Sequence, residues 1–186
     1  MEKNENTFEN IHSEEWKNNL SALPEIEYSE AMEKIRSGAI IKGVKIPFLN
    51  LDRTTFENPV VFENCYMQGL IARGSIFKEK ISIKSSLLVE RVEFSAYKDK
   101  DKNSFEKTTI EKGIEIDDCE FLDNLSLKND EISGNICVYK TNIAGIISLD
   151  KSVIHDGVYI SGPGKISVCT FYQARIDKQV VIDNYL

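Results

Sequence analysis

Two short segments of the chain hold residue types that could perform chemistry. His155 and Asp156 are adjacent, and an imidazole beside a carboxylate can serve as a general acid–base pair. Gly157 follows directly, and Asp-Gly is typical of a tight turn, so a turn is the favoured interpretation. The sequence Gly-Pro-Gly-Lys at 162–165 could cradle a phosphate, but it lacks the Ser or Thr that should follow the lysine. We interpret both segments as turns and expect that the protein is not an enzyme.

The cysteines do not have the spacing of metal ligands. No two of them form a CxxC pair, and neither of the two histidines, His12 and His155, lies near a second histidine. Cysteines of this kind are expected to be reduced thiols. We therefore predict neither a metal site nor a cofactor. The cysteines are Cys65, Cys119, Cys137 and Cys169.

The composition limits the classes of partner. The chain has 186 residues, of which 23 are basic and 30 acidic, so its net charge is −7. A binder of the phosphate backbone needs a clustered basic face, so we expect no direct contact with nucleic acid. No apolar run is long enough to span a bilayer, and residues 1–10 lack the apolar centre of a signal peptide. We expect a cytoplasmic protein that does not associate with membranes.

The elements that must position all these residues are defined by a repeat. Pairs of apolar residues that flank one outward residue return every 22 positions, at 136, 158 and 180. Alternation over three residues predicts very short strands separated by tight turns. A repeat of this length predicts units that stack and bury their apolar faces together. The first column of inward pairs contains Val60/Phe62, Ile81/Ile83, Ile114/Ile116, Ile136/Val138, Val158/Ile160 and Val180/Ile182.

Three further columns of inward pairs complete each unit. One step in the first column is 33 residues instead of 22, and it brackets residues 96–107, whose alternating Lys and Asp predict a solvated, inserted loop. We therefore expect one β-helical domain over residues 39–186, with three of the cysteines in small inward positions. The other columns include Cys65/Met67, Cys119/Phe121 and Thr141/Ile143; Leu70/Ala72, Val92/Phe94, Leu125/Leu127, Ile147/Leu149 and Cys169/Phe171; and Ser75/Phe77, Asp130/Ile132, Ser152/Ile154 and Ala174/Ile176.

Residues 1–38 have a helical pattern. Asn10 or Ser13 could cap a short helix over residues 14–20, which Pro24 should end. Ser29 is the expected N-cap of a second helix over residues 30–36, with Gly38 just past its end. Because a stack of strands leaves unpaired amides at its end, we expect the second helix to cover the N-terminal end of the stack.

The inward pairs of a small and then a large residue resemble the pentapeptide-repeat family. Cys-Glu-Phe at 119–121 and Leu-Asn-Leu at 49–51 are similar to its motif, and the resemblance extends over roughly residues 40–186. It implies an all-β solenoid: a right-handed quadrilateral parallel β-helix, here of about six rungs with a short N-terminal helical cap. The resemblance also implies a protein that acts by contact with other proteins and without catalysis.

Apolar residues at outward positions suggest two surfaces. In the early rungs we expect them to form a docking surface for the N-terminal tail, whose own apolar residues are Phe8, Trp16, Leu20, Leu23 and Ile26. In the late rungs they form a strip for which the sequence offers no cover, and such strips often mark an interface. The tail-docking surface consists of Val61, Tyr66, Ile71, Ile76 and Leu87. The candidate interface consists of Cys137, Tyr159, Val181, Tyr185 and Leu186.

Three functions remain open at this point. The first is a non-catalytic interaction module that binds an unidentified protein and forms a homodimer through its C-terminal rungs. The second is an acidic mimic of DNA that inhibits a DNA-handling enzyme such as a topoisomerase, which would need a continuous stripe of carboxylates. The third and least favoured is a polysaccharide-processing β-helix, which would need clustered carboxylates in a deep groove.

Overall fold

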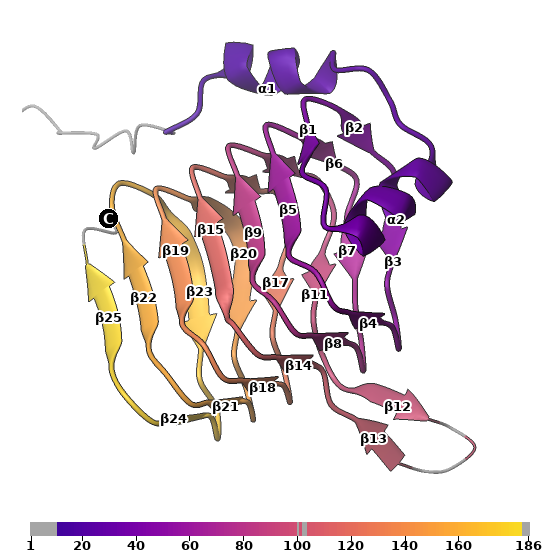
Figure 1. Ribbon diagram of the computed structural model, residues 1–186. Helices are drawn as coiled ribbons and strands as arrows, with labels where there is room; N and C mark the ends of the chain where they lie inside the picture. Colours follow the sequence, from indigo (N-terminus) through magenta and orange to yellow (C-terminus); the bar gives the residue numbers. More distant parts are fainter. Residues whose placement is uncertain (1–10, 100, 102–103, 184–186) are drawn as a thin grey trace, which may run out of the picture.

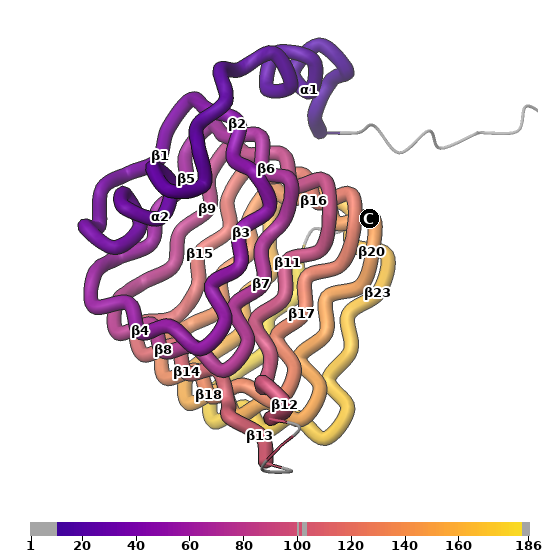
Figure 2. The backbone as a smooth tube through the Cα atoms, turned by 90° about the vertical axis from the view of Figure 1, so that its right-hand side faces the viewer, coloured from indigo at the N-terminus to yellow at the C-terminus, as the bar shows by residue number. Residues whose placement is uncertain are grey.

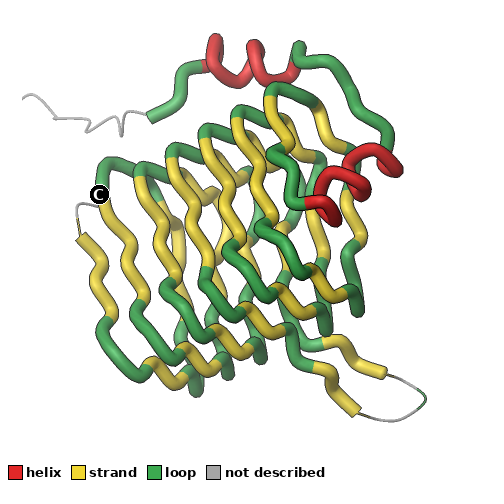
Figure 3. The backbone as a smooth tube through the Cα atoms, in the orientation of Figure 1, coloured by secondary structure: helices red, strands yellow, loops and turns green. Residues whose placement is uncertain are grey.

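The computed structural model describes residues 11–99, 101 and 104–183. Its body is a parallel β-solenoid of about six turns, with two helices on its N-terminal side (Figure 1). Viewed along its axis, the chain winds around four walls (Figure 2). Short strands alternate with turns throughout the body (Figure 3). The predicted fold class is confirmed.

Each wall is a ladder of parallel strands, one from each rung. The first wall consists of β1 (Ile41–Lys42), β5 (Val60–Glu63), β9 (Ile81–Lys84), β15 (Ile114–Asp117), β19 (Ile136–Tyr139), β22 (Val158–Ser161) and β25 (Val180–Asp183). The fourth wall consists of β4 (Thr55–Phe56), β8 (Ile76–Phe77), β14 (Thr109–Ile110), β18 (Glu131–Ile132), β21 (Val153–Ile154) and β24 (Arg175–Ile176).

The second and third walls join late in the chain, where one long strand crosses their shared corner. This strand is β20 (Asn142–Ser148), and β23 (Ile166–Thr170) pairs with it. The earlier strands of the second wall are β2 (Lys45–Ile46), β6 (Tyr66–Met67), β10 (Leu87–Leu88) and β16 (Glu120–Phe121). Those of the third wall are β3 (Leu49–Asn50), β7 (Leu70–Ile71), β11 (Val92–Glu93) and β17 (Leu125–Ser126).

The 22-residue repeat is the register of the first wall. Ile136 has Val158 as its Cα partner, and Val158 has Val180. The same inward pairs fill the core, where Phe62, Ile83 and Ile116 are at most 1% exposed. Strands in such a ladder lie about 4.8 Å apart, so each core side chain packs on its counterpart in the next rung.

Left-handed residues shape two of the four corners. After the first wall the chain turns through Asn64, Ser85, Asp118 and Lys140, all with positive φ between 43° and 57°. Before the fourth wall it turns through Arg53, Asn129, Lys151 and Gln173, with φ between 54° and 60°. A single residue in this conformation reverses a chain sharply, so two walls can follow each other with few linking residues.

The segment predicted as an inserted loop projects from the stack, and its described residues include an antiparallel pair of strands that the sequence analysis did not predict. The hairpin consists of β12 (Tyr97–Asp99) and β13 (Ser104–Glu106), and it projects from the corner between the third and fourth walls (Figure 1). Its base packs on that corner. The Arg53 guanidinium lies 5.1 Å from the Tyr97 ring centroid, and its Nε lies 3.0 Å from Glu106 Oε2. These contacts hold the base of the hairpin against the corner, while Lys98, Ser104 and Phe105 farther along it are exposed.

The first helix begins directly after Ser13, one of the two predicted N-caps. The helix α1 (Glu14–Ser21) follows Ser13, whose Oγ accepts a hydrogen bond from the Trp16 N–H at 3.1 Å. Such a cap satisfies one of the free amides of the first turn.

The second helix begins earlier than predicted. The helix α2 (Tyr28–Ser37) starts after Glu27, so Ser29 lies inside it and is not the N-cap. Its end is as expected, because Gly38 is left-handed with φ 74°. A Cβ at Gly38 would lie 2.7 Å from the Asn58 Cβ, and the Asn58 side chain donates to the carbonyl of Arg36 at 2.9 Å.

Helix α2 covers the N-terminal end of the stack. Its Ala31, Met32 and Ile35 are buried against the core. The Tyr28 hydroxyl donates to the Asn50 carbonyl at 2.8 Å, so the ring stays 42% exposed and does not join the buried face. The core of the first rungs is therefore closed on this side.

Candidate interaction surface

The late rungs bring three of the predicted interface residues together. Cys137, Tyr159 and Val181 are successive Cα partners on β19, β22 and β25, and each side chain is half-buried. They form a strip on the outside of the first wall, which we call the first-wall strip. Tyr185 and Leu186 lie outside the described residues.

Neighbouring groups hold the strip in place. The Tyr159 ring lies over Gly157, where a Cβ would come within 2.6 Å of the ring, and its hydroxyl accepts a hydrogen bond from Gln179 at 3.2 Å. On the adjacent rung, a hydrogen bond with the Cys137 side chain, together with burial, raises the pKa of Tyr139 to about 12. Tyr139 therefore stays a neutral phenol at ordinary pH, and no phenolate charge lies beside the strip.

The strip begins where an ion-pair cluster ends. Glu115, the Cα partner of Cys137, lies 3.1 Å from Lys84 Nζ and also pairs with Lys80. The hydrogen bond from Lys80 lowers the pKa of Glu115, and the charge of Lys84 adds to the effect. The central outward position of the first wall thus changes from a charged residue at Glu115 to Cys137, Tyr159 and Val181 in the later rungs.

The C-terminal end of the solenoid exposes its core positions. Val180 and Ile182 are 44% and 53% exposed, although their register partners Val158 and Ile160 are at most 1% exposed. The strands β25 and β24 are outermost in their ladders, and β23 pairs only with β20, so no described strand lies beyond them. The first-wall strip therefore runs directly into apolar core positions that no described residue covers fully.

The predicted tail-docking residues do not lie on one wall. Tyr66 and Leu87 are partners on the second wall, whereas Val61 lies on the first, Ile71 on the third and Ile76 on the fourth. The reason is that an outward residue recurs on every wall of each rung, so nearness in the sequence does not place two of them on the same face. The prediction had assigned outward residues from all four walls to a single surface.

Helix α1 lies over the second wall, beside two of these residues. Lys17 Nζ lies 2.7 Å from Glu120 Oε1, and Glu120 is the Cα partner of Leu87. Leu20 on α1 and Leu87 beneath are only 3% and 4% exposed. Nearer the capped end, Ile26 N–H donates to the Lys45 carbonyl at 3.0 Å, which ties the segment before α2 to the same wall. Phe8 lies outside the described residues.

A buried histidine lies at the start of this helix. His12 is 5% exposed and stacks on the Trp16 ring at 3.9 Å between centroids. Burial lowers the pKa of His12, and the negative charges of Asp118 and Glu120 oppose the shift. A neutral imidazole is therefore favoured beneath α1.

The structure separates His155 from Asp156. His155 Nδ1 lies 2.9 Å from Asp177 Oδ2, and Nε2 lies 3.5 Å from Glu131 Oε1, both one rung away on the fourth wall. The Asp156 carboxylate instead pairs with Lys178 at 2.9 Å. His155 thus lies between two carboxylates, one from the rung on each side of it. His155 and Asp156 therefore have different partners although they are adjacent in the sequence.

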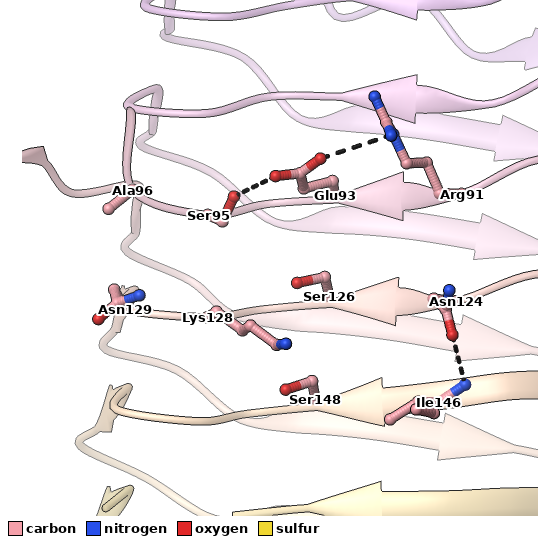
Figure 4. Close-up of a pocket in the computed structure, with 10 residues that line it drawn as sticks. All are labelled: Arg91, Glu93, Ser95, Ala96, Asn124, Ser126, Lys128, Asn129, Ile146 and Ser148. Carbon is pink, nitrogen blue, oxygen red and sulfur yellow. Dashed lines mark hydrogen bonds and ion pairs between the residues drawn. The ribbon is translucent and has the colours of Figure 1, made fainter. Parts of the chain in front are cut away.

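The third wall carries a shallow polar depression of about 390 Å³ (Figure 4). Its lining includes one carboxylate, Glu93, which accepts a hydrogen bond from Ser95 at 2.7 Å and lies 3.6 Å from Arg91 Nε. The Asn124 side chain accepts from the Ile146 N–H at 2.8 Å and so fastens two rungs.

The cysteines are free thiols. Cys65 and Cys119 are fully buried in small inward positions of the second wall, and burial raises the pKa of Cys119 to about 12 and that of Cys169 to about 11. Among the residues that the structure describes, no cluster of His, Cys, Asp and Glu could hold a metal ion. In the same residues, no helix is both long enough and apolar enough to cross a bilayer.

Cross-rung ion pairs are the surface feature that the sequence analysis missed. Partners occupy matching positions in neighbouring rungs, so the signal was opposite charge about one repeat apart. Such pairs include Lys42–Glu63, Asp52–Arg73, Glu57–Lys78 and Asp156–Lys178.

Comparison with known proteins found no matching family model, no matching curated protein and no matching solved structure.

Proposed function

We propose that this protein is a non-catalytic interaction module: a rigid β-solenoid that binds a protein partner through its late rungs. The observation that carries the proposal is the first-wall strip and its continuity with the exposed core positions of β25. Val180 and Ile182 leave apolar surface in water that equivalent residues of every earlier rung bury. Contiguous apolar surface of this kind is typical of an interface.

The partner that fits this end best is a second copy of the chain. No described strand pairs with the outer edge of β25, and two such edges can pair antiparallel about a twofold axis. Helix α2 covers the opposite end, which disfavours head-to-tail stacking and hence a filament. We propose a closed homodimer whose first-wall strips lie near its centre.

The remaining features of the proposal rest on the sequence as well. We propose a pentapeptide-repeat-like protein, supported by the small residues that alternate with large ones in the core, such as Cys119 and Phe121. We also propose a cytoplasmic location, supported by four free thiols in the described chain.

The charge arrangement weighs against a mimic of DNA. Cross-rung pairs such as Arg73–Asp52, at 2.6 Å, neutralise carboxylates along several corners and interrupt any acidic stripe. If a topoisomerase were nevertheless inhibited at low protein concentration, this alternative would replace our proposal.

Light scattering tests the homodimer. Tyr159→Lys places a charge in the first-wall strip, and Ile182→Lys places one at the C-terminal end. We expect a dimer mass for the wild type and at least a tenfold weaker association for both variants. Ile76→Lys is the matched control, because Ile76 is also an exposed outward residue, 38% exposed, but lies on the fourth wall. An unchanged dimer mass in both test variants would contradict the proposed surface.

A second measurement separates self-association from binding to another protein. If the wild type is monomeric at all concentrations, a pull-down with wild type and Tyr159→Lys side by side decides the point. A partner that is lost only in Tyr159→Lys would support the module without the dimer. A partner retained by both would contradict the strip.

A further inference from the structure

A column of small polar residues runs inside the fourth wall. Each occupies the inward position just before a large core residue, and each is 0% exposed. Three of them are hydroxyl residues, and the fourth is an aspartate. They are Ser75, Thr108, Asp130 and Ser152.

Each of the three hydroxyls donates a hydrogen bond toward a buried carbonyl of the third wall. Ser75 Oγ donates to the Leu51 carbonyl at 2.6 Å. Thr108 Oγ1 lies 3.0 Å from the Ala72 carbonyl oxygen and 2.8 Å from that of Ser95, which also accepts from the Gly74 N–H, so the Thr108 proton is shared between the two carbonyls. Ser152 Oγ donates to the Leu127 carbonyl. Leu51, Ala72 and Leu127 are each the second inward residue of the third wall, one rung nearer the N-terminus. Every hydroxyl therefore satisfies a carbonyl that would otherwise lack a donor inside the core.

The register assigns Asp130 the equivalent acceptor. Leu70, Val92 and Leu125 are successive Cα partners, so Phe94 stands one rung below Leu127 and one above Ala72. The carbonyl that corresponds to Asp130 is that of Phe94. An ionised carboxylate cannot donate to it, whereas a protonated carboxyl can.

Both carboxyl oxygens of Asp130 lack a hydrogen-bond partner among the described residues. A buried carboxylate without a partner is far more costly than a neutral carboxyl with one, and such a group takes up a proton instead. We propose that Asp130 is built into the core as an uncharged carboxylic acid that donates its proton to the Phe94 carbonyl, and that loss of this proton destabilises the rungs around it.

The charges near Asp130 favour the neutral form. Thr108 and Ser152 directly precede the adjacent strands β14 and β21 and are buried, and neither hydroxyl can neutralise an anion. From the third wall, the negative charge of Glu93 acts on it. Lys128 and Glu131, which flank it in the chain, are not buried. Burial raises the pKa of Asp130 well above its ordinary value, and Glu93 raises it further.

This arrangement makes folding depend on pH in a defined direction. The pKa of Asp130 is higher in the folded than in the unfolded chain, so its contribution to stability is complete below the ordinary Asp pKa, about 3.9, and falls as the pH rises. Between the two pKa values, the unfolding equilibrium constant rises about tenfold per pH unit from this one group. Other carboxylates that are ion-paired in the fold act in the opposite direction.

A comparison with Asp130→Asn isolates the effect. The amide has the same shape, can donate to the Phe94 carbonyl and has no proton to lose. Urea unfolding of both proteins should give a ratio of unfolding constants, wild type to variant, that rises about tenfold per pH unit between the ordinary Asp pKa, about 3.9, and the raised pKa of the folded chain. A ratio that does not change with pH would overturn the proposal. Glu93→Gln is the control, because it removes the nearby charge and should leave a slope in the wild-type direction.

The wild-type protein provides a readout that does not depend on a variant folding. With ¹³C-labelled aspartate, the carboxyl carbon of Asp130 should keep the chemical shift of a protonated acid at a pH at which the exposed aspartates are already ionised. If all aspartate carboxyl carbons were ionised at that pH, the proposal would be wrong.

Discussion

The two ends of the solenoid differ in how far their core residues are covered. At the N-terminal end, α2 packs Ala31, Met32 and Ile35 over the core, and Gly38 ends the helix where Asn58 meets it. At the C-terminal end, Val180 and Ile182 keep the inward orientation of their column but remain about half exposed. Within the described residues, one end is covered by a helix, whereas no described strand pairs with the outer edge of the last rung. Stacked repeats are stabilised by their neighbours, so stability should fall along the axis toward the C-terminal end.

Alanine at one register position in two rungs tests this difference most strongly. Ile83 is 1% exposed and Ile182 is 53% exposed on the same inner column. We expect Ile83→Ala to cost about 2–5 kcal/mol of unfolding free energy and Ile182→Ala about 1 kcal/mol or less, because the cost scales with the buried volume lost. Urea unfolding measures both. Equal costs would show that the C-terminal end is covered in solution.

The turn that ends α2 allows a second test at the capped end. Gly38 and Gly43 both have positive φ, but a Cβ would meet Asn58 only at Gly38 and nothing within 4 Å at Gly43. Gly43→Ala should cost about 1–2 kcal/mol from backbone strain, and Gly38→Ala about 1–3 kcal/mol more from the clash. Thermal unfolding of the two variants checks this order, and a reversed order would mean that α2 does not need its tight end.

The helix caps give a smaller effect. Ser13→Ala should reduce the stability of α1 by about 1 kcal/mol, because the Trp16 amide loses its acceptor. Ser29→Ala should leave α2 unchanged within about 0.5 kcal/mol, since Ser29 caps no helix. Hydrogen exchange of the amides of each helix is the measurement. Faster exchange in α2 of Ser29→Ala would reinstate Ser29 as a cap.

The smallest expected effect concerns the pKa of His155, on the fourth wall in the late rungs. Hydrogen bonds to Asp177 and Glu131 raise the pKa of His155 above 6.5. Because the pKa is raised in the folded state, the contribution of His155 to stability is complete below about pH 6.5 and disappears as the pH rises through the folded pKa. An NMR titration should show a lower His155 pKa in Asp177→Asn and little change in Asp156→Asn, whose carboxylate pairs with Lys178.

Inward residues could be predicted from the sequence because their period is physical. The 22-residue return of Ile136, Val158 and Val180 reappears as strict Cα pairing, since parallel strands must bury like positions together. Residue types alone indicated Asn10 or Ser13 as the first N-cap, of which the structure has Ser13, and they placed Gly38 just past the end of the second helix.

Outward residues could not be placed as well. Val61, Tyr66, Ile71 and Ile76 are close in sequence, yet each lies on a different wall. Which wall α1 covers depends on tertiary contacts such as Lys17–Glu120, which join residues far apart in the chain. The hairpin strands could not be predicted for the same reason, because Tyr97 and Glu106 contact Arg53, which is far from both in the sequence.

The hairpin leaves the stack undisturbed, since Ile110 directly after it pairs with Phe77 before it and with Ile132 above. At the corner between the third and fourth walls, the chain leaves the stack and returns to it at points roughly 5 Å apart, the separation of two antiparallel strands. A foreign hairpin, tag or short domain with similarly close ends could be grafted there in place of residues 98–105. The solenoid would then become a carrier on which a chosen segment is displayed at a fixed distance from both ends.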